Sequence, residues 1–187
     1  MARRDLIADA GMRLIARGGV HALTHLAVDA EAGLPRGSTS YYARTRRDLI
    51  ALVAGRLSEG SQADLDGVRI PAALTRAEAV RAAVGVLDHM AEREDAQAAR
   101  FALMFELRDD DELRNALTAR APVRAPLTAE AERLLRAIDV ADPAAHAPDL
   151  VGLIDALLMY RTARAAPVNA VRVLSAYFDG LPTNLPR

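Results

Sequence analysis

The chain has 187 residues, no cysteine and a formal net charge of −1, and 51% of its residues are hydrophobic. The lack of cysteine excludes a disulfide framework and a thiolate zinc site, while the length allows one or two compact units with a buried core. Alanine, leucine and valine dominate and no segment alternates with a period of two, so composition and pattern predict an all-α protein.

The basic residues, all of them arginine, are unevenly distributed along the chain. Residues 1–56 hold nine arginines against five acids, whereas residues 57–187 hold fifteen against twenty. This asymmetry is consistent with an anion-binding N-terminal part that contacts a phosphate backbone, and chance scatter of charge explains it equally well. We expect no signal peptide and no membrane segment, because even the most apolar run, 150–160, is short and contains Asp155. We therefore expect a cytoplasmic protein.

Two helices and a turn are predicted at the N-terminus. Apolar residues at helical spacing extend to Gly18 and Gly19, where the glycines end the first helix. Thr24 can cap a second helix that runs to about Ala32. Gly33 then allows a turn, because glycine tolerates a positive φ. This is the first half of a helix-turn-helix pattern.

The second half follows directly. Pro35 suits the first position of a short third helix that runs to about Ala43, and Thr45 can cap a longer fourth helix. In a helix-turn-helix the second helix of the motif enters the major groove of DNA. The pattern therefore predicts a DNA-binding domain over residues 1–56, followed by a helical regulatory and dimerisation domain over residues 57–187.

The residues in and around the third helix suit DNA. Arg36 can reach a guanine edge with two hydrogen bonds, Gly37 lets the backbone come close, and the methyl group of Thr39 can contact thymine. Hydroxyl and arginine side chains at the helix ends can bind phosphates. Alternatively, one tyrosine packs in the core and the arginines, Arg47 in particular, are merely solvated. The predicted DNA-contacting residues are Thr24, Arg36, Gly37, Ser38, Thr39, Ser40, Tyr41, Tyr42, Arg44, Thr45 and Arg46.

Beyond residue 67 the pattern predicts further helices. Thr75 and Glu78 form a capping box, and the acidic run 109–112 is typical of a helix N-terminus. Pro122 and Pro126 predict a kink or break, and a loop is expected over 143–148.

Medium-sized apolar residues of this part can line a small-molecule pocket, although a Met/Phe stripe is also typical of plain core. The candidate pocket residues are Leu87, His89, Met90, Arg100, Phe101, Met104, Phe105, Glu106, Leu134, Asp155 and Met159.

The last two predicted helices have more apolar surface than one core can hide. We expect this surface to pair across a two-fold axis in a homodimer. The candidate interface residues are Leu150, Ile154, Leu157, Leu158, Val171, Leu174, Tyr177 and Phe178.

The N-terminal segment resembles the DNA-binding domain of the TetR family of transcriptional repressors. The resemblance rests on LTHLAVDAEAGLPRGS, the following tyrosine pair and the start of the fourth helix, RRDLI. Asp29 and Ala43 depart from the family pattern, which usually has a small residue and a phenylalanine there, and Arg44 and Arg46 replace its proline and lysine. The resemblance implies a dimeric repressor that binds a palindromic double-stranded DNA operator and leaves it when a small-molecule inducer binds.

Other functions have less support in the sequence. His21 and His25 are spaced by four residues, but the cap at Thr24 lies between them, so we expect no metal site. No phosphate-binding glycine loop or nucleophile motif is present, so we expect no cofactor and no enzyme. Two alternatives remain open: a ligand-independent dimeric DNA-binding protein, and a helical protein-interaction module.

Overall fold

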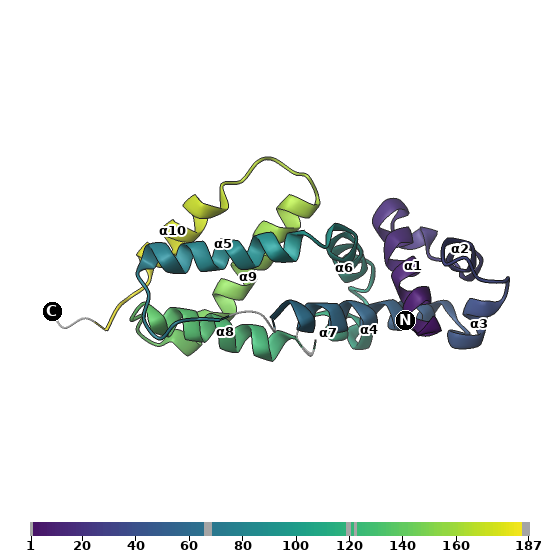
Figure 1. Cartoon of the computed structure of the whole chain (residues 1–187), viewed down its shortest axis with the longest axis horizontal. Helices are drawn as coiled ribbons and strands as arrows, with labels where there is room; N and C mark the ends of the chain where they lie inside the picture. The colour runs from purple at the N-terminus through teal and green to yellow at the C-terminus, as the bar shows by residue number, and fades with distance from the viewer. Residues whose placement is uncertain (1, 66–68, 119–120, 122, 185–187) are drawn as a thin grey trace. The chain divides into compact units, whose positions relative to one another are not determined.

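The computed structural model describes residues 2–65, 69–118, 121 and 123–184, and nearly all of its regular structure is helical (Figure 1). These residues form no strand; they contain one isolated antiparallel bridge, between Val140 and Thr183. The prediction of an all-α fold is confirmed.

The chain divides into two compact units, residues 1–62 with 93–122, and residues 63–92 with 123–187. The helices of the first unit are α1 (Arg3–Gly18), the short 3-10 helix η1 (Val20–Ala22), α2 (His25–Glu31), α3 (Ser38–Tyr42), α4 (Arg46–Leu65), whose last residues pass into the second unit, α6 (Glu94–Glu106) and α7 (Asp111–Leu117). The helices of the second unit are α5 (Arg76–Ala91), α8 (Arg124–Ala137), α9 (Pro143–Thr162) and α10 (Ala170–Gly180).

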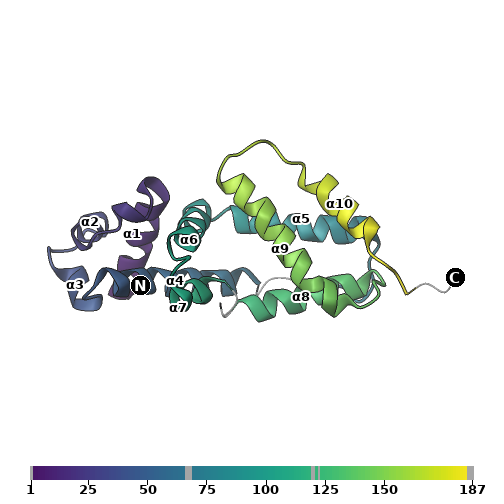
Figure 2. The same ribbon diagram turned by 180° about the vertical axis from the view of Figure 1, so that it is seen from behind.

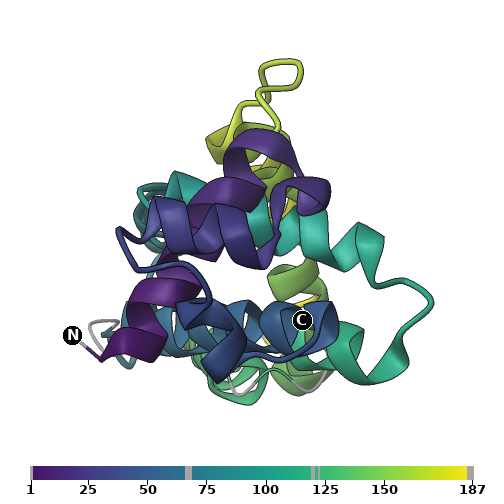
Figure 3. The same cartoon turned by 90° about the vertical axis from the view of Figure 1, so that its right-hand side faces the viewer.

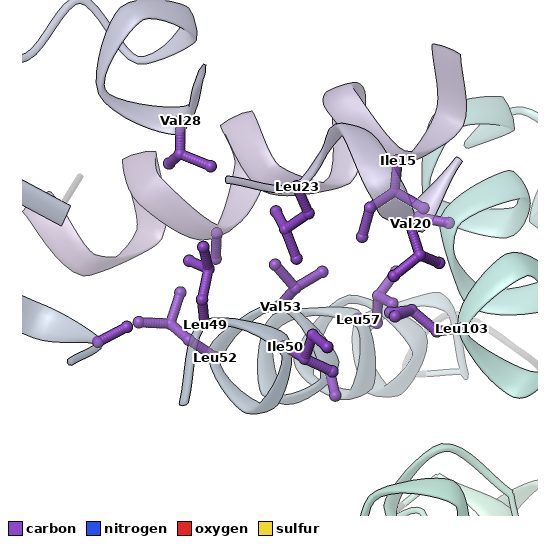
Figure 4. Packing of buried hydrophobic residues seen from close by; sticks show 14 of the residues in the cluster. Ile15, Val20, Leu23, Val28, Leu49, Ile50, Leu52, Val53, Leu57 and Leu103 are labelled. Carbon is purple, nitrogen blue, oxygen red and sulfur yellow. The ribbon is translucent and has the colours of Figure 1, made fainter. Parts of the chain in front are cut away.

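The first unit is larger than the predicted DNA-binding domain of residues 1–56. Its core contains Leu103 of α6, which is fully buried beside Val20 and Leu57 (Figure 4). Burying a leucine side chain contributes about 1.5–3 kcal/mol, so α6 helps to hold the unit together. Packing therefore assigns residues 93–122 to the N-terminal unit, while the functional boundary near residue 56 stays a prediction.

A close approach of α1 and α4 lies in this core. A Cβ atom built on Gly11 of α1 would stand 2.6 Å from Cγ2 of Val53 on α4, which is closer than carbon atoms approach. Only glycine fits there without a shift of the neighbouring side chain. This contact brings α1 and α4 close together at Val53.

The predicted helix starts are confirmed at two caps. The Thr75 side chain accepts a hydrogen bond from the Glu78 backbone N–H, and the Glu78 carboxylate accepts from the Thr75 N–H, which completes a capping box for α5. Asp110 caps α7 by accepting from the Leu113 backbone N–H, so the acidic run 109–112 does surround a helix N-terminus.

The proline predictions need one correction. The expected break lies between α7, which ends at Leu117, and α8, which begins at Arg124. Pro126 lies in the first turn of α8, and Pro122 lies outside the described residues. The expected loop over 143–148 is wrong, since α9 begins at Pro143 and runs through Pro148. Pro126 and Pro143 are tolerated in the first turns of α8 and α9, because the N–H groups there have no intrahelical acceptor, whereas Pro148 lies inside α9.

In the second unit α9 packs on α8 and on α5, and α5 also packs on α10 (Figure 2). Arg76, at the start of α5, donates to the backbone carbonyls of Phe178 and Leu181 and so fixes the end of α10. Leu135, Leu150, Leu158, Leu174 and Phe178 are fully buried within this unit. Among the residues that the structure describes, no helix is both long and apolar enough to cross a membrane.

Candidate nucleic-acid interface

The helix-turn-helix consists of α2 and α3, joined by residues 32–37 (Figure 3). The second helix begins at Ser38 and not at Pro35 as predicted, because the Ser38 N–H closes a turn on the Pro35 carbonyl and Gly37 has a left-handed φ of 88°. With five residues, α3 is too short to be stable alone. Contacts from outside must hold it.

Asp29 on α2 holds the N-terminus of α3. Its Oδ2 accepts from the Gly37 backbone N–H at 2.7 Å, and its Oδ1 accepts from the Thr39 N–H at 2.7 Å and from the Thr39 hydroxyl at 2.6 Å. Burial alone would raise the pKa of Asp29. The hydrogen bonds from Thr39 and Gly37 and the proximity of His25 lower it by more than that, so the pKa of Asp29 lies below its usual value. The ionised carboxylate is therefore the form that caps the helix.

His25 holds the other end of α3. Its Nε2 lies 2.8 Å from the Ala43 carbonyl oxygen, which can only accept, so Nε2 carries the proton and donates. His25 and Asp29 are four residues apart and so share one face of α2. Through these two side chains α2 fixes both termini of α3, and His25 is already engaged in a structural role.

Salt bridges fix α2 in turn. Glu31 lies 2.8 Å from Nε of Arg13 on α1 and also pairs with Arg17, and the two arginines lower the pKa of Glu31. Thr24 caps α2, because its hydroxyl accepts from the Ala27 N–H at 3.2 Å. The predicted cap at Thr24 is confirmed, and its exposed side chain stands at the N-terminus of α2.

The start of α4 is capped and tied to α7. The Thr45 N–H donates to the Asp48 carboxylate at 2.9 Å, which holds the pKa of Asp48 below its usual value, and the Asp48 N–H donates to the Thr45 hydroxyl at 3.0 Å. Arg47 pairs with Asp110 and Glu112, each at 2.8 Å. Of the two interpretations of Arg47, the structure supports internal pairing.

The arginines of residues 1–62 fall into two groups. Arg13, Arg17, Arg47 and Arg56 each pair with an acidic side chain of the same unit, and Arg46 donates to the Val20 carbonyl at 2.9 Å. The second group consists of exposed arginines without an acidic partner among the described residues, and on either side of α3 these are Arg36 and Arg44. Two of the free cations thus flank the short helix, and Arg3 and Arg4 of α1 belong to the same group.

The outer surface of α3 carries hydroxyl groups. Tyr41 is 82% exposed and Tyr42 40%, with their rings edge to face at a centroid distance of 5.1 Å. Ser40 is exposed and Ser38 is half-buried. Together with the exposed Gly37, this surface offers hydrogen-bond donors, two cations and a close backbone approach, which is the chemistry that phosphates and base edges accept.

One predicted contact is corrected. Thr39 is fully buried and its hydroxyl donates to Asp29, so its side chain serves the helix cap and cannot reach thymine in this structure. The remaining ten predicted residues lie on or beside α3, or at the start of α2, where all but Ser38 are exposed.

Three residues of this region were not predicted as functional. Asp29 and His25 hold α3, and Leu26, 52% exposed on α2, lines a groove of about 490 Å³ together with Leu34 and Arg36. The sequence signal for Asp29 was its place at a position where a small residue is usual. An acid there calls for a donor, and Thr39 is that donor.

The candidate pocket residues do not gather in one unit. Arg100, Phe101, Met104, Phe105 and Glu106 belong to the first unit, whereas Leu87, His89, Met90, Leu134, Asp155 and Met159 belong to the second. Phe105 is 68% exposed, and the Arg100 guanidinium lies 5.0 Å from the centre of the Phe101 ring. Of the whole set, only Leu134 lines the cavity found in the second unit.

The candidate dimer residues are also mostly internal. Leu150, Leu158, Leu174 and Phe178 are fully buried within one chain, and Ile154 and Leu157 are less than 10% exposed, so these six form the core of the second unit. Tyr177 is half-buried and its hydroxyl donates to the His146 carbonyl at 3.2 Å. Of the eight candidates, only Val171, 52% exposed, leaves an apolar side chain largely open to solvent, and its place in an interface stays a prediction.

The arrangement defines a class: an all-helical protein with a capped helix-turn-helix whose second helix is flanked by unpaired arginines. A family model described as the tetracyclin repressor-like C-terminal domain matches residues 74–181, more than half of the chain. The chain belongs to the TetR family of transcriptional regulators. Comparison with curated proteins finds no match.

Solved structures agree on the fold. A transcriptional regulator from Rhodococcus sp. Rha1 superposes with a TM-score of 0.76 at 16% identity, over 99% of this chain and 100% of that one. A TetR family member from Streptomyces coelicolor A3 superposes with a TM-score of 0.67 at 23% identity, over 96% of this chain and 97% of that one. The multidrug binding protein EbrR, complexed with proflavin, superposes with a TM-score of 0.58 at 24% identity, over 95% of this chain and 98% of that one. The first two of these proteins are described as a transcriptional regulator and a TetR family member.

Proposed function

We propose that this regulator is a repressor that binds a palindromic operator as a homodimer and releases it when a small molecule binds. The proposed role is binding and not catalysis. Since a repressor acts where the chromosome lies, we assign it to the cytoplasm.

The observation that carries the DNA-binding part is the division of the arginines. Arg13, Arg17, Arg47 and Arg56 are neutralised within the first unit, whereas Arg36 and Arg44 remain exposed and unpaired beside α3. A cation that no side chain neutralises is available to a phosphate or a guanine edge. We assign Arg36, which precedes α3, to base contact and Arg44, which follows it, to phosphate contact.

The remaining residues of the proposed interface supply supporting contacts. Thr24 at the start of α2 and Thr45 at the start of α4 stand at helix N-termini, which favour anions. The hydroxyls of Ser40, Tyr41 and Tyr42 face outward. Arg46 contributes charge, although its hydrogen bond to Val20 also makes it structural.

The homodimer is supported by apolar groups that stay exposed in the second unit. Tyr160 on α9 is 46% exposed, and Val168 and Val171 at the start of α10 are 44% and 52% exposed. Gly152, Ala156 and Tyr160 are exposed at intervals of four residues along α9, so they share one face. We propose that this face and Val171, in place of the buried leucines, meet their copies across the two-fold axis.

Control by a small molecule is supported by the family and by the ligand bound to one similar protein. EbrR was crystallised with proflavin. A ligand that binds more tightly to a form with a different spacing of the two α3 helices lowers DNA affinity by that difference in affinity. The dimer must hold these helices about 34–36 Å apart, or a multiple of that, to read successive major grooves.

Recovery of genomic fragments by the purified protein tests this proposal. We expect enrichment of a few fragments that share an inverted repeat, and binding that weakens steeply as salt rises. Genes next to the fragments then suggest inducers to test. Specific binding that no such compound relieves would favour the ligand-independent DNA-binding protein, and failure to bind any DNA at low salt would favour the protein-interaction module.

A further inference from the structure

The helix-turn-helix leaves an aliphatic side chain open to solvent on its first helix. Among the described residues of the first unit, the exposed large hydrophobic ones are Leu26, Phe105 and the two tyrosines of α3, and of these only Leu26 is aliphatic. A lone exposed leucine is ordinary on a protein surface. Leu26 is not alone, because it shares a groove of about 490 Å³ with three further apolar residues, Ala27, Ala30 and Leu34.

Helical geometry places this groove beside α3. Leu26 and Ala30 are both exposed and lie one turn apart, so they form a strip along one side of α2. Each follows by one residue a side chain that holds α3, His25 in the first case and Asp29 in the second. Neighbouring residues of a helix are turned by about 100°, so the strip adjoins the face that contacts α3.

The strip also points away from the core of the first unit. Val28 is fully buried and marks the side of α2 that faces the core. Leu26 lies two residues before it, a turn of about 200°, which places the two side chains on opposite sides of the helix. The apolar strip is therefore turned outward, next to the recognition helix.

Residues that we assign to DNA contact line the same groove. Thr24 and Arg36 both do so, and Arg36 is exposed without an acidic partner among the described residues. The one acid of the groove, Asp29, is only 2% exposed and its carboxylate accepts hydrogen bonds from Gly37 and Thr39. A groove with an open cation and no open acid favours a polyanion over an apolar protein segment as its occupant.

The apolar group that base edges present in the major groove is the C5-methyl group of thymine. We infer that Leu26 is a specificity-determining residue that contacts a thymine methyl group beside the base pair read by Arg36. This inference rests on the proposed DNA binding and adds a base contact from α2 to those of α3. It supplies the thymine contact expected of Thr39, whose side chain is buried in the helix cap.

Deoxyuridine tests the contact, because it pairs as thymine does and lacks only the methyl group. Each thymine of a recovered genomic fragment is replaced in turn, and the affinity of the full-length protein is measured by fluorescence anisotropy at constant salt. Burial of a methyl group contributes about 0.8 kcal/mol, which is about fourfold in affinity. We expect this loss per methyl group at the thymine next to the base pair whose preference Arg36→Ala relaxes.

Leu26→Ala completes a double-mutant cycle with this substitution. It should weaken binding of the thymine fragment by about fourfold per half-site, and deoxyuridine at the same position should then add no more than about 1.5-fold. Unrelated DNA should bind Leu26→Ala as tightly as wild type, since phosphate contacts carry that affinity. Phe105→Ala is the matched control, because Phe105 is an exposed hydrophobic residue of the same unit on α6; it should keep the full loss with deoxyuridine.

The inference is wrong if no deoxyuridine substitution beside the Arg36 base pair weakens wild-type binding, or if no thymine stands there. It is also wrong if wild type and Leu26→Ala lose equally, since the shape of the DNA or another residue then accounts for the effect. Unchanged binding of the thymine fragment by Leu26→Ala would assign the groove to another partner.

The wild-type measurements depend on no variant that must fold. A protein that binds its fragment with the same affinity after every replacement refutes the contact of Leu26 alone. Failure to bind any DNA refutes the proposed function instead.

Discussion

At the scale of single residues, Asp29 makes polar contacts at a position where the family pattern usually has a small residue. A carboxylate that accepts three hydrogen bonds from Gly37 and Thr39 is satisfied although it is only 2% exposed. The sequence identified Asp29 as unusual and Thr39 as a base contact, but not their hydrogen bond. The two lie ten residues apart across a turn, and no periodicity relates them.

Asp29→Asn should destabilise the first unit and weaken DNA binding. An amide can replace one carboxylate oxygen as acceptor, but its NH₂ group then faces an N–H of Gly37 or Thr39. The loss of one charged hydrogen bond and the clash of two donors should lower the free energy of unfolding by about 1–3 kcal/mol. Chemical denaturation at pH 7 measures it, with Asp109→Asn as the control because Asp109 is exposed.

The pH dependence separates the charge from the shape of Asp29. Its pKa is lowered in the folded protein, so its contribution to stability is present above the ordinary pKa of about 3.9 and is lost as pH falls through the lower, folded value. The difference in stability between wild type and Asp29→Asn should therefore shrink as pH falls below about 4. A difference that stays constant down to pH 3 would mean that the cap does not need the ionised form.

At the scale of elements, the sequence predicted where the helices lie along the chain better than which helices pack together. Periodicity and caps placed α1, α2, α5 and α10 close to their observed ranges, because these signals are local. The packing of α6 into the first unit was missed, since Leu103 and its contacts Val20 and Leu57 are separated by dozens of residues. The expected loop at 143–148 failed because Pro143 fits the first position of α9 and the helix continues through Pro148.

Gly11→Ala and Gly55→Ala form a matched pair for the contact between α1 and α4. Both glycines are inside helices, where alanine gains about 1 kcal/mol of helix propensity. A Cβ at Gly55 meets nothing within 4 Å, whereas one at Gly11 lies 2.6 Å from Val53. Thermal unfolding should show Gly55→Ala more stable than wild type, and Gly11→Ala less stable than Gly55→Ala by about 1–3 kcal/mol. Equal effects would mean that the two helices are not in tight contact.

At the scale of the whole molecule, the proposed function depends on two copies of the chain. From the sequence we expected α9 and α10 to pair with their copies, but the residues selected were mostly those of their buried sides. A helix that is apolar all round gives no sign of which face meets its own core. The residues left exposed on α9 and α10 now define the proposed interface.

Ala156→Glu should separate the proposed dimer, because it places a charge in the middle of the exposed face of α9 without touching the core. Leu157→Glu, one residue on, should instead unfold the second unit, since Leu157 is 8% exposed. Sizing with light scattering at micromolar concentration distinguishes folded monomers from aggregates. Wild type that runs as a monomer, or Ala156→Glu that remains dimeric, would rule out this interface.

The central claim is that DNA binds through the unpaired arginines beside α3. The most direct test compares the affinity of Arg36→Ala and Arg44→Ala for a recovered fragment and for unrelated DNA, over a range of salt concentrations. Arg36→Ala should lose about 1–3 kcal/mol on the specific fragment and relax base preference, and Arg44→Ala should weaken both DNAs alike and reduce the salt slope by about one. Arg172→Ala, an exposed arginine of α10, should change neither. Binding that survives both substitutions beside α3, or falls equally with Arg172→Ala, would contradict the account.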